Sequence, residues 1–98
     1  MKNMDRNKLE KFIEKETARV ARDYNFTGRV LFYKDGRIGV QFTTNIINIT
    51  HRVTLLNTLN QEMLDTYSEE DITKFIEDLA EDLDDEEADL LVKEWLGV

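Results

Sequence analysis

The sequence predicts one α+β domain, in which an N-terminal helix and a β-hairpin or three-stranded antiparallel sheet precede three helices, the last two strongly acidic. Its 98 residues are 41% hydrophobic and 35% charged, which is typical of a single small globular domain. Near both ends, apolar residues recur at steps of three and four, as in amphipathic helices. Between them, two β-rich runs flank the turn signature Lys34-Asp35-Gly36.

Charge divides this predicted single domain, 1–98, into two parts. Residues 67–98 contain thirteen carboxylates and two lysines, a net charge of −11, whereas residues 1–66 contain eleven basic and eight acidic side chains, a net charge of +3. The total of −8 favours a partner with a basic surface over nucleic acid or an anionic membrane. The absence of cysteine, of an apolar signal region and of a long apolar run predicts a cytoplasmic protein.

Residues 5–23 are predicted to form the first helix, with Asn3 or Asp5 as its N-cap. Its apolar face follows Leu9, Phe12, Ile13, Glu16, Val20 and Tyr24. A basic stripe lies beside that face within an arc of about 80°. The stripe consists of Lys8, Lys11, Lys15, Arg19 and Arg22. One interpretation is a solvated flank, and the other is a secondary surface for an anionic partner.

Residues 25–28 are predicted as a turn, and the run GRVLFYKDGRIGVQF that begins at its end as a hairpin. A two-residue turn would pair Leu31 with Val40, whereas a three-residue loop with a left-handed Gly36 would pair Val30 with Val40. We choose the second register because it gathers the apolar residues on one face that can be buried. That face would contain Val30, Phe32, Ile38, Val40 and Phe42.

Residues 43–66 fit two structures. Their apolar residues recur at steps of three and four, and we predict a helix over 51–65. The β-branched run at 45–50 is also typical of a third strand, with Thr50 as the cap of the following helix. We leave 45–50 open between strand and helix.

Residues 69–83 and 84–96 are predicted to form two helices that meet at a tight corner. Each begins with a possible capping box, Ser68 to Asp71 and Asp84 to Glu87, and Gly97 is a natural end for the second. The core stripe of the first would contain Ile72, Phe75, Ile76, Leu79 and Leu83. That of the second would contain Ala88, Leu91, Val92 and Trp95. Over the whole chain, the expected core anchors are Phe32, Val40, Phe75 and Trp95.

No motif predicts catalysis, a metal or a cofactor. The acidic run at 82–89 lacks the central glycine of a calcium loop, and exposed helical carboxylates lack the cleft that separates their pKa values. There is no phosphate loop, nucleophile motif or dinucleotide fingerprint. His51, the only histidine, is interpreted as a surface residue because it has no partner for a site. We therefore expect a protein that is not an enzyme and holds no metal or cofactor.

The acidic helices carry two adjacent rows of carboxylates with Lys74 as the only interruption. Like charges at i,i+4 cost a helix about 0.2–0.5 kcal/mol per pair, and three such pairs are Glu77/Glu81, Asp78/Asp82 and Glu81/Asp85. Either the rows are a solvated face that keeps the protein soluble, or they resemble a phosphate backbone and bind a basic partner. The predicted partner-binding residues are Glu70, Glu77, Asp78, Glu81, Asp82, Asp85 and Glu86.

Two broad resemblances follow from these features. The order of helix, hairpin, third strand and helix is similar to that of double-stranded-RNA-binding domains, although acid replaces the lysine-rich start of the last helix. In size, charge and lack of cysteine, the chain resembles small phage-encoded inhibitors of host defence, including nucleic-acid mimics that block restriction or CRISPR nucleases. The second resemblance implies an inhibitor of a nucleic-acid-processing protein.

Three functions remain open at this stage. The first is an acidic inhibitor that mimics nucleic acid. The second is an adaptor or homo-oligomer in which the basic first helix of one copy meets the acidic face of another. The third is a nucleic-acid binder that uses the basic stripe together with Arg29 and Arg37.

Overall fold

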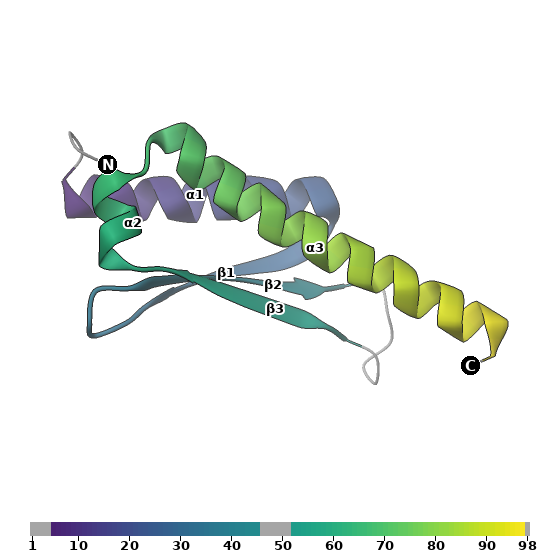
Figure 1. Cartoon of the computed structure of the whole chain (residues 1–98). Helices are drawn as coiled ribbons and strands as arrows, with labels where there is room; N and C mark the ends of the chain where they lie inside the picture. Colours follow the sequence, from purple (N-terminus) through teal and green to yellow (C-terminus); the bar gives the residue numbers. More distant parts are fainter. Residues whose placement is uncertain (1–4, 46–51, 98) are drawn as a thin grey trace.

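The computed structural model describes residues 5–45 and 52–97. Its elements are α1 (Arg6–Tyr24), β1 (Phe26–Phe32), β2 (Ile38–Thr44), β3 (Thr54–Leu59), α2 (Gln61–Thr66) and α3 (Glu69–Leu96). The strands form one antiparallel sheet in the order β1-β2-β3, and α1 and α3 lie on the same side of it (Figure 1). The α+β class is confirmed. The expectations for residues 46–50, for His51 and for an Asn3 cap fall outside the described residues.

The first helix forms as the sequence predicts. The side chain of Asp5 caps α1 by accepting a hydrogen bond from the backbone N–H of Lys8 at 2.9 Å. Asn25 ends the helix with a left-handed φ of 58°, and β1 begins directly after it. The predicted turn over residues 25–28 is therefore wrong beyond Asn25, because one left-handed residue is enough to reverse the chain. The buried residues of α1 are Leu9, Ile13, Thr17, Val20 and Ala21.

The hairpin has the predicted three-residue register. Val30 pairs with Val40, and Gly36 in the loop has a φ of 95°, which suits a residue without a Cβ. Ile38, Val40 and Phe42 are fully buried beneath the helices. Gly28 lets α1 approach the sheet closely, since a Cβ there would lie 3.0 Å from the Cβ of Ala21.

The helix predicted over 51–65 is wrong. Thr54–Leu59 is the strand β3, which pairs with β2, and only Gln61–Thr66 is helical. The central strand β2 is the most buried of the three and needs hydrogen-bond partners on both edges, so sheet pairing overrides the helical spacing of the apolar residues. Asn60 ends the strand segment and caps α2 by accepting a hydrogen bond from the N–H of Met63.

The two predicted acidic helices are one helix. Ser68 and Asp71 form the expected capping box, and Gly97 ends α3 with a left-handed φ of 75°. Between them the helix runs without a corner for 28 residues, because Asp84 and Glu87 are helical and form no second cap. The segment contains no glycine or proline and is rich in Glu and Leu, which favour continuation.

The predicted core is correct for the first part of α3 and wrong for the last. Val40 is fully buried, and Phe75 is partly buried against the core. Phe32, the last residue of the edge strand β1, is 49% exposed, and Trp95 is 86% exposed. The elongated molecule measures 51 × 25 × 19 Å, and the end of α3 projects past the sheet (Figure 1). Trp95 is exposed because no described element covers that end.

Candidate protein-binding face on the last helix

The carboxylate rows lie on the solvent side of α3. All seven predicted partner-binding residues are exposed: Glu70, Glu77, Asp78, Glu81, Asp82, Asp85 and Glu86. The opposite side of the helix is packed on the core, so the rows belong to a helix that is held in place for its first four turns. The structure therefore brings these residues together on one continuous face.

The density of charge on this face is close to that of nucleic acid. From Glu77 to Asp89, eight carboxylates are exposed over twelve residue steps, which is about 18 Å of helix. This amounts to about one negative charge per 2.3 Å. A single DNA strand carries about one per 3.4 Å and the duplex about one per 1.7 Å of axis. The helix face lies between these two values.

Two of the seven carboxylates have cationic neighbours. Arg19 of α1 lies 3.8 Å from Glu77, and Lys74 lies 3.5 Å from Asp78. The other five form no ion pair with the residues that the structure describes. Burial raises the pKa of the Tyr24 hydroxyl, and the nearby carboxylates of Glu81 and Asp84 raise it further. The face therefore produces a negative potential that extends to the end of α1.

The basic stripe lies next to the acidic face. Lys8, Lys11, Lys15 and Arg22 are exposed, whereas Arg19 is half-buried and donates hydrogen bonds to Glu16 and Asp23 at 3.1 and 3.2 Å. The hydrogen bond from Arg19 lowers the pKa of Glu16, which also accepts a hydrogen bond of 2.8 Å from the hydroxyl of Thr73 on α3. Arg19 and Glu16 thus join the two helices, and four cations remain toward solvent.

Arg29 and Arg37, which the nucleic-acid-binding hypothesis adds to the basic stripe, lie apart from each other. Arg29 lines a hollow with Glu14 and Ala18, on the β1 side of α1. Arg37 lies at the hairpin turn, where it pairs with Asp35 at 2.8 Å and stacks over the ring of Tyr33 at 4.8 Å. The structure does not gather all these cations into one surface.

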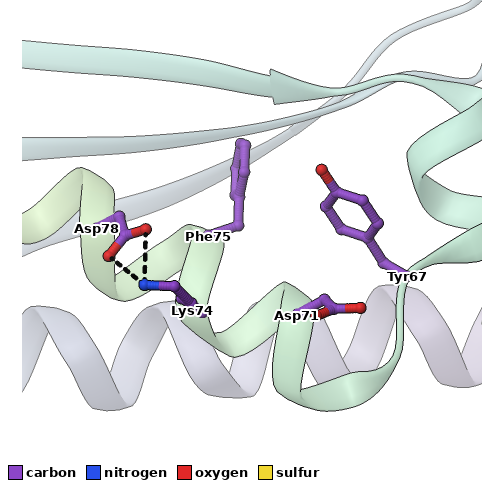
Figure 2. A pocket seen from close by; sticks show the side chains of 5 residues that line it. All are labelled: Tyr67, Asp71, Lys74, Phe75 and Asp78. Atoms are coloured by element: carbon purple, nitrogen blue, oxygen red, sulfur yellow. Dashed lines mark hydrogen bonds and ion pairs between the residues drawn. The ribbon is translucent and has the colours of Figure 1, made fainter.

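A shallow hollow borders the acidic face near the start of α3 (Figure 2). The rings of Tyr67 and Phe75 point away from the helix on the same side, and the carboxylates of Asp71 and Asp78 lie at its margins, with Lys74 between them. A planar aromatic surface beside carboxylates suits an arginine or lysine side chain. The sequence pattern did not indicate this hollow, because it needs Tyr67 before the helix to lie beside Phe75 within it.

An apolar stripe at the end of α3 is the main feature that the sequence analysis assigned wrongly. Ala88, Leu91, Val92 and Trp95 were predicted as core, yet all are exposed, Leu91 by 43% and Val92 by 54%. Their i, i+3, i+4, i+7 spacing does define one face, but that face points away from the core. The signal that could have shown this is the change of phase from the buried stripe that ends at Leu83.

Glu87 is the last buried residue of α3 and is only 6% exposed. Its Oε2 atom has no hydrogen-bond partner within the part of the chain that the structure describes. Burial raises the pKa of this carboxyl, and the charge of Asp84 raises it further. Glu87 was predicted to cap a helix, and its carboxyl instead lies buried at the edge of the core.

Within residues 5–45 and 52–97, no group of three or more potential ligands could hold a metal ion, and no helix is long and apolar enough to cross a membrane. Comparison with protein-family models, curated proteins and solved structures gave no match to this chain.

Proposed function

We propose that this protein is a non-enzymatic inhibitor whose acidic α3 face occupies a basic, nucleic-acid-contacting surface of a partner protein. One observation carries the proposal: eight exposed carboxylates over about 18 Å of a continuous helix. The spacing of these charges along the helix is similar to that of phosphates, so the row suits a cationic groove. The proposal needs no cofactor, and it assigns the protein to the cytoplasm, where phage-encoded inhibitors of host nucleases act.

Pre-organisation supports this role. The first part of α3 is held against the core through Ile72, Ile76 and Leu83, so the carboxylates are fixed before a partner arrives. Their mutual repulsion is relieved when lysine and arginine side chains approach, and complementary charge speeds association. The hollow beside Tyr67 and Phe75 gives one arginine of the partner an aromatic surface.

A second candidate function is a homo-oligomer built on the same layer. The exposed lysines of α1 lie beside the carboxylates of α3, and Arg19 already bridges the two helices through Glu77. A two-fold axis across this layer would place the lysines of one copy against the carboxylates of the other. Sedimentation at low and high salt distinguishes this candidate, because such an oligomer would form in the absence of any other protein and dissociate with salt.

The test of the first function is a charge reversal. We expect Glu81→Lys, Asp82→Lys and Asp85→Lys together to abolish capture of nucleic-acid-binding proteins from a host lysate, while the fold is retained. These three carboxylates are exposed and have no ion-pair partner among the described residues, whereas Glu77 is avoided because Arg19 contacts it. A matched control reverses Glu14, Glu62 and Asp65, which are also exposed and lie outside α3.

Two results would contradict the proposal. In one, the α3 triple variant captures the same proteins with unchanged salt dependence. In the other, the wild-type protein itself binds DNA or RNA at physiological salt, which would transfer the function to the basic stripe of α1.

A further inference from the structure

The apolar stripe of Ala88, Leu91, Val92 and Trp95 lies on the part of α3 that extends past α1. The two helices run side by side in the same direction, since Glu16 meets Thr73 and Arg19 meets Glu77. The last residue of α1, Tyr24, lies near Glu81 and Asp84, since burial raises the pKa of its hydroxyl and these two carboxylates raise it further. The twelve residues of α3 that follow, about 18 Å of helix, extend beyond the end of α1 (Figure 1).

The stripe continues the acidic face without a gap. At 100° per residue, Ala88 and Val92 follow Glu77, Glu81 and Asp85 on the outward side of the helix. The exposed fractions there rise toward the end of the helix, to 86% at Trp95. A partner that lies along the carboxylate rows therefore reaches the stripe next.

The charges around the stripe decide what can cover it. Residues 84–97 contain six carboxylates and only Lys93 as a cation, a net charge of −5. A second copy packed on the stripe would bring two such segments together, and their repulsion opposes that contact. A surface that combines an apolar pocket with lysines or arginines satisfies both the stripe and its acidic margins.

We propose that Trp95, with Ala88, Leu91 and Val92, is the apolar anchor of the interface and inserts into a pocket that basic side chains border on the partner protein. The inference rests on the proposed function and adds a second component to it. The carboxylate rows provide the salt-sensitive attraction, and the stripe provides a contact that salt does not screen. Tryptophan is among the residues most enriched in binding hot spots, which lie in desolvated pockets at the centre of an interface.

Two synthetic helical peptides test the anchor. The first carries lysines with leucines at i, i+3, i+4 and i+7, and the second replaces each leucine with glutamine at the same net charge. Trp95 is the only tryptophan, so its emission reports contact directly. We expect the leucine peptide to bind at least about tenfold more tightly and to shift the Trp95 emission to shorter wavelength. This ratio of affinities should persist as added salt weakens the binding of both peptides.

Variants assign the effect to the stripe, with affinity measured from the anisotropy of labelled peptides. Trp95→Ala should remove the preference for leucine, whereas Leu56→Ala, an exposed apolar position on β3 at 46%, should leave it unchanged. Equal affinity for both peptides would overturn the anchor and leave the acidic face standing. Failure of both peptides to bind would overturn the proposed function as well. Concentration-dependent dimers with a shifted Trp95 emission would assign the stripe to a second copy and overturn the inference.

Discussion

The first and last parts of α3 have similar helix-forming sequences and different surroundings. Up to Leu83, one side of the helix is buried against α1 and the sheet, and the other displays carboxylates. After Glu87, no residue of the helix is fully buried, and its apolar side chains face solvent. Amphipathic spacing therefore shows that a helix has an apolar face, but it does not show what covers that face. Here the apolar face of the first part packs in the core of the domain, and the apolar face of the last part is available to a partner.

The largest expected difference between the two parts is in folding free energy. Ile76→Ala should lower the free energy of unfolding by about 2–5 kcal/mol, because the side chain is fully buried. Val92→Ala, a β-branched residue of the same helix at 54% exposure, should change it by less than about 0.5 kcal/mol. Urea unfolding of both variants measures this. Comparable losses would show that the end of α3 packs on the domain in solution.

Glu87 marks the boundary between the two parts, and its replacement should stabilise the fold. Glu87→Leu removes a buried carboxyl whose Oε2 atom has no hydrogen-bond partner among the described residues, and we expect a gain of about 1–3 kcal/mol at pH 7. The folded-state pKa of Glu87 is raised, so the stability that its neutral form provides is present at low pH and is lost as pH rises through that pKa. The gain from Glu87→Leu should therefore shrink as the pH falls toward 4.

Glu86→Leu is the matched control for this pH effect, because Glu86 is adjacent and exposed. Urea unfolding of wild type and both variants at several pH values separates the two positions. A gain at Glu87 that is the same at pH 4 and pH 7 would rule out its ionisation as the cause.

Salt should produce the smallest effect, through the carboxylate rows of α3. Three like-charge i,i+4 pairs together cost about 1 kcal/mol, and Arg19 and Lys74 neutralise only two of the carboxylates. Screening should therefore raise the melting temperature by a few degrees between low and moderate sodium chloride. In Glu81→Gln/Asp85→Asn the rise should be smaller. A fall in the wild type would instead show that attraction between α1 and α3 dominates.

The sequence was sufficient to predict the structure wherever contacts between nearby residues determine it. Asp5, the capping box from Ser68 to Asp71 and Gly97 mark helix ends through contacts with residues four or fewer positions away. The register of the hairpin followed from Gly36 and from the face that can be buried. The carboxylates of the candidate site were predicted as a group because the helical spacing that buries Ile72, Ile76 and Leu83 turns them toward solvent.

The predictions that were wrong concern features that depend on contacts between distant parts of the sequence. Thr54–Leu59 has helical spacing but pairs with β2, a partner more than ten residues away in sequence. The possible capping box from Asp84 to Glu87 suggested a corner that would bury Trp95, whereas the helix continues and leaves the stripe uncovered. The hollow at Tyr67 and the burial of Glu87 likewise depend on packing between segments.

The most direct test of the central claim is a displacement measurement. A nucleic-acid-binding protein that the wild-type chain captures is loaded with fluorescent DNA or RNA, and the chain is then added at physiological salt. We expect the nucleic acid to be released in proportion to the chain that binds, because the carboxylates of α3 and the phosphates compete for the same cations. A stable ternary complex, with the nucleic acid and the chain bound at once, would contradict the claim.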